Sequence, residues 1–284
     1  MDKRKAILST ILSIMLAVIF VMILYIATRF AVVMLQTKHI TVDGDMYAAS
    51  TVIEGTTFVL ILLLTMILGK LDIMKSTWKS FKAGFGAGAF LFVYLTFSAV
   101  VMIGIGIINP QSHFVSAPKI IAFTLYMLFI GLTEEFMFRG LIQNYLVDAY
   151  GKTKIGTISA IVVASIIFGE AHIINAVGAL PLKGVVYQML GAAALGMYIG
   201  AVYARCNNIW VVALMHALMD FVALINSGLF GVGSMETEVA SYDASQLFAV
   251  VLYVALALFV LRSAKMNYEG NDKDTIENIT LDDK

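Results

Sequence analysis

Hydrophobic residues fill long stretches of this chain without the regular polar interruptions of a soluble amphipathic helix or strand. Four stretches contain no Asp, Glu, Lys or Arg: residues 6–28, 83–118, 184–204 and 244–261. A helix needs about 20 apolar residues to cross the hydrocarbon core of a bilayer. Because the runs are continuous rather than alternating, they indicate membrane helices and not the strands of a barrel.

The same pattern predicts eight membrane spans, at residues 6–28, 47–69, 83–108, 119–147, 155–177, 184–204, 208–227 and 244–262. The expected fold is therefore all-α, a polytopic integral membrane helical bundle with about eight transmembrane helices. The first run could be mistaken for a signal peptide. Its apolar part is too long and no small-residue cleavage site precedes a soluble domain, so we interpret it as a retained span.

Composition excludes several classes of protein. Of the 284 residues, 60% are apolar and only 13% are charged, which is too much apolar surface for a soluble chain of this size to bury. The net charge is zero, which argues against a nucleic-acid partner and leaves the lipid bilayer as the expected surroundings. The single cysteine, Cys206, excludes an internal disulfide framework and a multi-cysteine metal cage.

Lysine and arginine predict the orientation. With a cytoplasmic N terminus, fourteen of the nineteen Lys and Arg residues would face the cytoplasm and four the other side, leaving Arg139 inside the membrane. The positive-inside rule therefore predicts a multi-pass protein of the cell membrane with both termini in the cytoplasm. The polar, acidic tail after Lys265 is expected to be disordered.

Ionisable residues inside the predicted spans are the strongest functional signal. Such a residue costs about 2.5–3.5 kcal/mol on insertion scales and usually marks function. Seven of the eight fall in the fourth, fifth and seventh spans. The eight are Glu54, Glu134, Glu135, Arg139, Glu170, His172, His216 and Asp220.

In the fourth span, Glu135 and Arg139 are four residues apart and share a helix face, in the order that favours an ion pair. Glu134 lies about 100° away around the axis and is expected to lack this countercharge. A carboxylate in such surroundings can exchange a proton near neutral pH, which suits a general acid or base. We therefore predict a supporting ion pair and, beside it, a catalytic Glu134.

In the fifth span Phe168 and His172 share a face, and in the seventh His216 and Asp220 do. An Asp one turn from a His can hold the tautomer and orientation of the imidazole. Two histidines with helical partners in separate spans favour a catalytic interpretation over a structural one.

The other ionisable groups are interpreted as non-catalytic. Glu170 is expected to point away from His172, and Glu54 to snorkel or to be satisfied by a partner near the outer end of its span. His39 and His113 fall in predicted outer loops, where no role is expected.

Together, the spaced groups Glu134-Glu135-x-x-x-Arg139, Phe168-x-x-x-His172 and His216-x-x-x-Asp220 resemble the CAAX protease and bacteriocin-processing family (CPBP, or Abi) of intramembrane endopeptidases, which is related to the Rce1-type CAAX prenyl proteases. Each motif alone is short, but the three in order on membrane helices are fairly specific. The resemblance covers about 110 residues. It divides the chain into N-terminal helices (1–117), a catalytic core (118–227), and the last helix with a cytoplasmic tail (228–284).

The resemblance implies a glutamate-dependent peptidase inside the membrane, in which Glu134 with His172 activates a water. His216 and Asp220 would stabilise the oxyanion or orient the site. The last motif position is often Asn in this family, and an ionised Asp cannot donate a hydrogen bond to an oxyanion. Asp220 is therefore expected either to be protonated or to support His216.

Glu135, Arg139 and Phe168 take supporting positions in the same scheme. The implied substrate is a membrane-associated peptide or protein, such as a bacteriocin or signalling-peptide precursor.

Three alternatives stay open at this point. Two histidines and a glutamate could hold zinc, although no H-E-x-x-H motif is present, and we expect no metal and no cofactor. The chain could instead be a non-catalytic membrane scaffold or regulator, for example in bacteriocin immunity. An ion-coupled transporter using Glu134 and Glu170 as a relay is disfavoured, because no internal repeat is visible.

Overall fold

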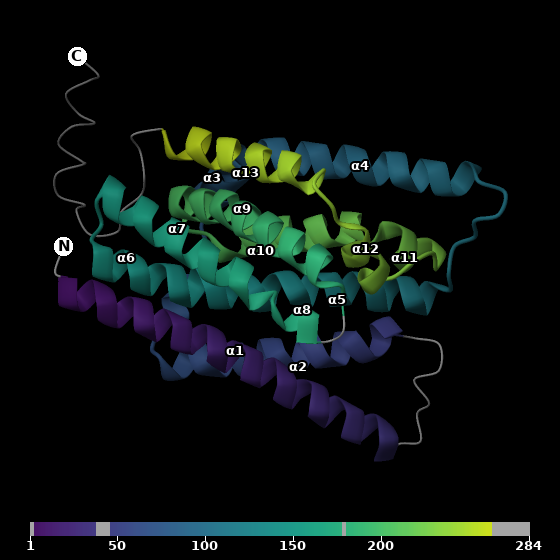
Figure 1. The fold of residues 1–284 in the computed structure, drawn as a ribbon, viewed down its shortest axis with the longest axis horizontal. Helices are drawn as coiled ribbons and strands as arrows, with labels where there is room; N and C mark the ends of the chain where they lie inside the picture. The colour runs from purple at the N-terminus through teal and green to yellow at the C-terminus, as the bar shows by residue number, and fades with distance from the viewer. Residues whose placement is uncertain (1–2, 38–45, 178–179, 263–284) are drawn as a thin grey trace.

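The computed structural model describes residues 3–37, 46–177 and 180–262, and these form helices joined by short connections, with no β-strand (Figure 1). His39 and the polar tail after Lys265 lie outside the described residues. The first half contains α1 (Lys3–Thr37), α2 (Met46–Ile67), the 3₁₀ helix η1 (Leu71–Met74), α3 (Trp78–Ala87), α4 (Ala89–Ile108), α5 (Ala117–Glu135), the π-helix η2 (Phe136–Gln143) and α6 (Asn144–Tyr150). The second half contains α7 (Lys154–Ala171), α8 (Ile174–Val177), α9 (Leu182–Cys206), α10 (Ile209–Ala223), α11 (Ile225–Phe230), α12 (Met235–Ser241) and α13 (Gln246–Leu261).

The predicted all-α membrane bundle is confirmed. Among the described residues, six helical segments are long and apolar enough to cross a membrane, and a seventh forms if α12 and α13, bent by 93°, count as one span. The seventh predicted span corresponds to α10, an apolar helix of only 15 residues, and the eighth to α13. The protein is thus a multi-pass membrane protein with about the expected number of spans.

Several predicted spans are not single continuous helices in the structure. They are interrupted at positions where the hydropathy of the sequence does not change. The fifth ends at Ala171 and resumes as the single turn α8, and the seventh ends at Ala223 before α11. At the bend between α12 and α13, the Asp243 carboxylate accepts a hydrogen bond from the Ser245 backbone N–H at 2.8 Å, a local contact that competes with helix continuation.

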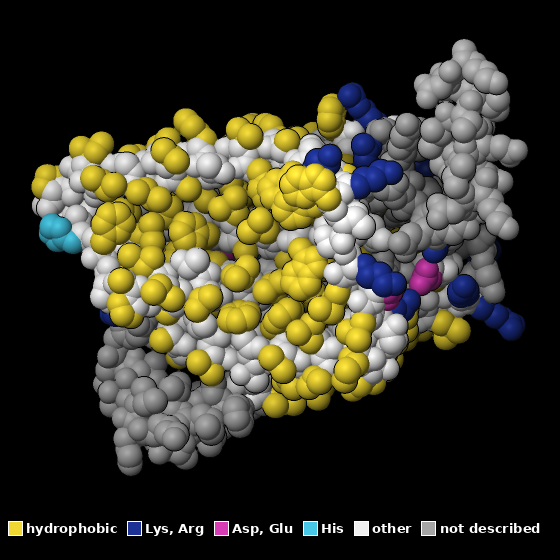
Figure 2. Space-filling model, turned by 180° about the vertical axis from the view of Figure 1, so that it is seen from behind, with side chains coloured by type: hydrophobic (Ala, Val, Ile, Leu, Met, Phe, Trp, Pro, Cys, Tyr) yellow, Lys and Arg dark blue, Asp and Glu magenta, His cyan; other side chains and the backbone are white. Residues whose placement is uncertain are grey.

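The two ends of the bundle differ in charge. The beginning of α1 and the end of α13 lie at the same end in Figure 1. Figure 2 shows Lys and Arg gathered at one end of the visible face, with hydrophobic side chains over most of the rest. Apolar side chains such as Phe97, Val100 and Val251 are more than 60% exposed, as expected of a surface that contacts lipid.

The segment from Ala117 to Tyr150 is one continuous helical rod through the centre of the bundle, made of α5, η2 and α6. It packs against α2 and α10, and a Cβ on Gly131 would come within 2.5 Å of the Ala213 carbonyl oxygen. The absence of a side chain at Gly131 therefore lets α5 and α10 approach closely. This approach brings Glu134 and Glu135, at the end of α5, opposite His216 on α10.

The rod was predicted as a plain α-helix, but its middle is a π-helix whose eight residues are all buried. A π-helix has wider turns than an α-helix and occurs frequently at functional sites. Here it begins directly after Glu135 and contains Arg139.

Candidate active site

Glu135 lies at the centre of a buried polar cluster. Its side chain is fully buried, and its Oε1 accepts a hydrogen bond from Arg139 Nη1 at 2.7 Å and another from His216 Nδ1 at 2.6 Å. The predicted ion pair between Glu135 and Arg139 is therefore present. Because an ionised carboxylate only accepts hydrogen bonds, Nδ1 of His216 carries the proton, and Nε2 is the nitrogen left for other groups.

This contact corrects one expectation. Asp220 was predicted to hold the imidazole of His216, but Glu135 makes the short bond to Nδ1. Asp220 Oδ2 lies 3.6 Å from the opposite nitrogen, Nε2. The sequence spacing could not indicate this, because Glu135 and His216 are 81 residues apart.

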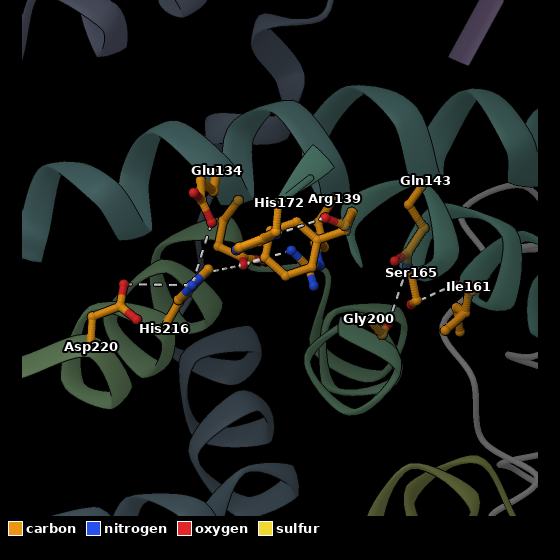
Figure 3. Close-up of polar contacts among 11 residues, drawn as sticks. Glu134, Arg139, Gln143, Ile161, Ser165, His172, Gly200, His216 and Asp220 are labelled. Carbon is orange, nitrogen blue, oxygen red and sulfur yellow. Dashed lines mark hydrogen bonds and ion pairs between the residues drawn. The ribbon is translucent and has the colours of Figure 1, made fainter. Parts of the chain in front are cut away.

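Glu134 faces the same nitrogen of His216 from another direction. Its Oε2 lies 3.5 Å from Nε2, so Glu134, which makes no ion pair with Arg139 among the described residues, faces a cation when His216 is protonated (Figure 3). Both distances to Nε2 exceed those of a good hydrogen bond. Nε2 of His216 is therefore attracted electrostatically by Glu134 and Asp220, but it makes no short hydrogen bond to either carboxylate. It can form a hydrogen bond with a third group that lies between them.

The exposure of these groups divides the cluster in two. Glu135 and Arg139 are 0% and 2% exposed, whereas the side chains of Glu134 and Asp220 are 20% and 28% exposed. We call Glu135 and Arg139 the closed half of the site, and Glu134, Asp220 and His172 the open half. His216, on α10, contacts both halves.

Phe168 and His172, at the end of α7, complete the arrangement. The Phe168 ring lies 4.6 Å from the Arg139 guanidinium and meets the rings of His172 and His216 edge to face. His172 Nδ1 lies 3.0 Å from the Phe168 carbonyl oxygen, an acceptor that fixes the proton on Nδ1 and leaves Nε2 free. Among the described residues, His216 and not His172 lies within ion-pair distance of Glu134.

The guanidinium of Arg139 also needs space on the side that faces α9. A Cβ on Gly196 of α9 would lie 3.1 Å from both Arg139 Nη2 and Phe168 Cδ1. The glycine therefore leaves just enough room for the guanidinium to lie against the aromatic ring. No motif pointed to this residue, because its role depends on the packing of α9 against α7 and the rod.

The open half faces a cavity of about 250 Å³ between α1, α2, the rod, α7, α8, α9, α10 and α12. Glu134, His172, His216 and Asp220 all line it, so the four residues predicted to be catalytic share one space.

Glu54 also lines the cavity, so of its two expected roles snorkelling near the outer edge is wrong, whereas satisfaction by a partner stays a prediction. A charge in an otherwise uncharged span was the signal that could have identified it. Glu170 is exposed and does not line the cavity, and exposed His113 takes no part in the site.

The described residues show no grouping of three or more His, Cys, Asp and Glu side chains arranged to hold a metal ion. Cys206 is buried against the Asn208 carbonyl oxygen, away from the cavity lining. What the site offers is an acid–base set: carboxylates and imidazoles with accessible atoms, and a closed half that fixes one imidazole.

Comparison with protein families gives one finding for this region. Residues 116–222 match the family model described as type II CAAX prenyl endopeptidase Rce1-like. The matched segment begins one residue before α5 and ends within α10, so it contains both halves of the site. No curated protein sequence matches the chain. The family resemblance proposed from the three motifs is confirmed.

Proposed function

We propose that this chain, which belongs over residues 116–222 to the Rce1-like CAAX endopeptidase family of membrane proteases, is an intramembrane endopeptidase that hydrolyses a membrane-associated peptide by a glutamate- and histidine-activated water. The observation that supports this most directly is the arrangement around His216. Its Nδ1 is held by Glu135, while its Nε2 lies at the cavity between Glu134 and Asp220.

Glu134 is the proposed general base. As a carboxylate at the cavity wall, it takes one proton from a water, and the resulting hydroxide attacks the carbonyl carbon of the peptide bond. His172 lines the same cavity and, with Nδ1 held by Phe168, directs its Nε2 toward that water in our scheme. When the C–N bond breaks, Glu134 returns the proton to the leaving amine.

His216 is the proposed oxyanion group. The bond from Nδ1 to the Glu135 carboxylate favours a protonated imidazole, because the positive charge then faces an ionised partner. Its Nε2–H can donate to the carbonyl oxygen as negative charge develops there. Asp220, 3.6 Å away, keeps this charge in place and need not donate a hydrogen bond itself.

We also propose a domain division of the chain and an orientation in the membrane. We propose residues 118–227 as the catalytic core, although α1, α2 and α12 also line the cavity, so the core is incomplete without them. The gathering of Lys and Arg at one end supports a cytoplasmic location for both termini in the cell membrane.

The function can be tested by comparing membranes of cells that produce the wild-type chain with membranes of cells that produce Glu134→Ala. Mass spectrometry of membrane-associated peptides should show at least one uncleaved precursor that accumulates in the Glu134→Ala cells. Equal peptide profiles, with equal amounts of the two proteins in the membrane, would contradict the proposal and favour a non-catalytic scaffold.

A further inference from the structure

The cavity beside the proposed active site is acidic beyond what the chemistry needs. Four carboxylates line it: Glu54 of α2, Glu134 of the rod, Asp220 of α10 and Glu238 of α12. No Lys or Arg is among the described residues that line it. Among those described lining residues, the only basic side chains are the imidazoles of His172 and His216.

The available countercharges are already shared. His216 lies within 3.6 Å of both Glu134 and Asp220. Arg139 is bonded to Glu135 in the closed half and does not line the cavity. Glu54 and Glu238 take part in no ion pair within the described ranges, so two carboxylates of the cavity have no protein cation beside them.

These two carboxylates reach the cavity from different helices, α2 and α12. Glu54 is near enough to interact electrostatically with Glu134 and Asp220, on the side of α2. Glu238 belongs to the wall formed by α12, and Tyr242, the residue after this helix, lines the same cavity. A peptide lying across Glu134 and His216 would therefore share the cavity with two carboxylates that have no ion-pair partner among the described residues.

A carboxylate shielded from water without a cation beside it is costly, and a cationic ligand that pairs with it recovers part of that cost. A second negative charge in the same cavity would be repelled instead. We propose that the substrates of this site carry a Lys or Arg side chain close to the cleaved bond, selected by Glu54 and Glu238. This inference rests on the proposed function and names its substrate class.

The test uses internally quenched, apolar decapeptides in liposomes containing the purified full-length protein. Each set contains three peptides that have Lys, norleucine or Glu at one position and are otherwise identical. The sets differ in which position along the peptide is varied. At one or two positions next to the cleaved bond, the Lys peptide should have a kcat/KM about tenfold above the norleucine peptide, as one charge-assisted hydrogen bond provides. The Glu peptide should be cleaved most slowly.

Glu238→Gln and Glu54→Gln should each reduce this Lys preference severalfold. Glu236→Gln is the matched control, because Glu236 is on α12 but exposed and outside the cavity lining. It should keep the full preference. Two variants on different helices keep the test decisive if one of them folds poorly.

Binding of fluorescent Lys and norleucine peptides, followed by anisotropy, separates this inference from the proposed function. Cleavage without any preference for Lys at any position overturns the inference and leaves the peptidase intact. Preferential binding of Lys peptides without cleavage supports the acidic subsite and contradicts the peptidase. A preference that survives in Glu54→Gln, Glu238→Gln and the double variant also overturns the inference.

Discussion

The closed and open halves of the site contain neighbouring glutamates with opposite surroundings. Glu135 is fully buried and binds Arg139 and His216 through short hydrogen bonds. Glu134, the preceding residue, is partly exposed to a cavity and approaches His216 only to 3.5 Å. The two residues have the same chemistry and adjacent positions, so their different environments come entirely from the direction in which the helix points them.

The difference indicates that the two glutamates have different roles. A carboxylate that accepts two short, charge-assisted hydrogen bonds, as Glu135 does through Oε1, is held in one position and contributes rigidity. A carboxylate with an accessible oxygen can bind water and exchange a proton. His216 connects the two, since its Nδ1 belongs to the closed half and its Nε2 to the open half. Variants of each half should therefore fail in different ways.

Glu134→Gln, in the open half, should give the largest loss of activity, about 10³-fold or more, since the amide keeps the shape of the side chain but cannot accept the proton of water. Hydrolysis by purified protein in liposomes measures this, and the thermal unfolding midpoint should stay near that of the wild type. Glu170→Gln, at an exposed position, is the control and should be as active as the wild type. Normal turnover by a folded Glu134→Gln protein would remove the mechanism proposed here.

Glu135→Ala, in the closed half, should instead destabilise the fold, by about 3–5 kcal/mol, because it leaves Arg139 charged and buried without its partner. Chemical unfolding in detergent micelles measures the change. The double variant Glu135→Ala with Arg139→Ala should recover part of this loss, since neither buried charge then remains. If the double variant loses as much as the two single variants added together, the two residues are not energetically coupled.

Variants of the two histidines should distinguish the role of the closed half from that of the open half. His172→Ala and His216→Ala should each reduce kcat by about 10²–10⁴-fold, the usual contribution of acid–base groups. Only His216→Ala should also lower stability, by about 1–3 kcal/mol, since it removes a hydrogen-bond donor from buried Glu135. Paired activity and unfolding measurements check this. Equal stability of the two variants would show that the bond to Glu135 contributes little.

Gly196→Ala is expected to disturb the closed half only slightly. Its Cβ would lie 3.1 Å from Arg139 Nη2 and Phe168 Cδ1, so both must shift, at a cost of about 1 kcal/mol. Gly191→Ala on the same helix is the matched control, because its Cβ would meet no atom within 4 Å. The control should be neutral or slightly stabilising. Unfolding midpoints of the pair measure the difference, and a Gly196→Ala protein as stable as the control would show that the guanidinium has room to spare.

Treatment with a metal chelator should leave the hydrolytic activity of the site unchanged. Dialysis against a strong chelator, followed by the hydrolysis assay, should leave activity unchanged, because the proposed chemistry uses only carboxylates and imidazoles. Loss of activity that added zinc restores would make His172 and His216 ligands. Glu134 would then be a ligand or act on a metal-bound water, and the proposed mechanism would be wrong.

The sequence predicted the membrane bundle and most of its spans because a bilayer selects for long uncharged runs, which composition alone reveals. It also indicated the chemistry, because charges inside such runs are rare and costly. The ion pair of Glu135 and Arg139 followed from helix spacing, since both partners belong to one turn. In each case the information is local in the sequence.

What spacing could not reveal was which groups from different helices meet. The close approach of α5 and α10 at Gly131 brings Glu135, rather than Asp220, to Nδ1 of His216. The position of α2 brings Glu54 to the cavity. The breaks after Ala171 and Ala223 were also missed, because hydropathy does not change where a helix changes direction.

The sequence by itself therefore determined that the protein lies in a membrane, which residues are chemically exceptional, and which of them share a helix turn. Only the tertiary structure decided which glutamate is buried and which one faces the cavity, and which nitrogen of His216 each carboxylate meets. The physical reason is that helix periodicity fixes the relative directions of side chains within one helix. The rotation and separation of two helices depend instead on packing along their whole lengths.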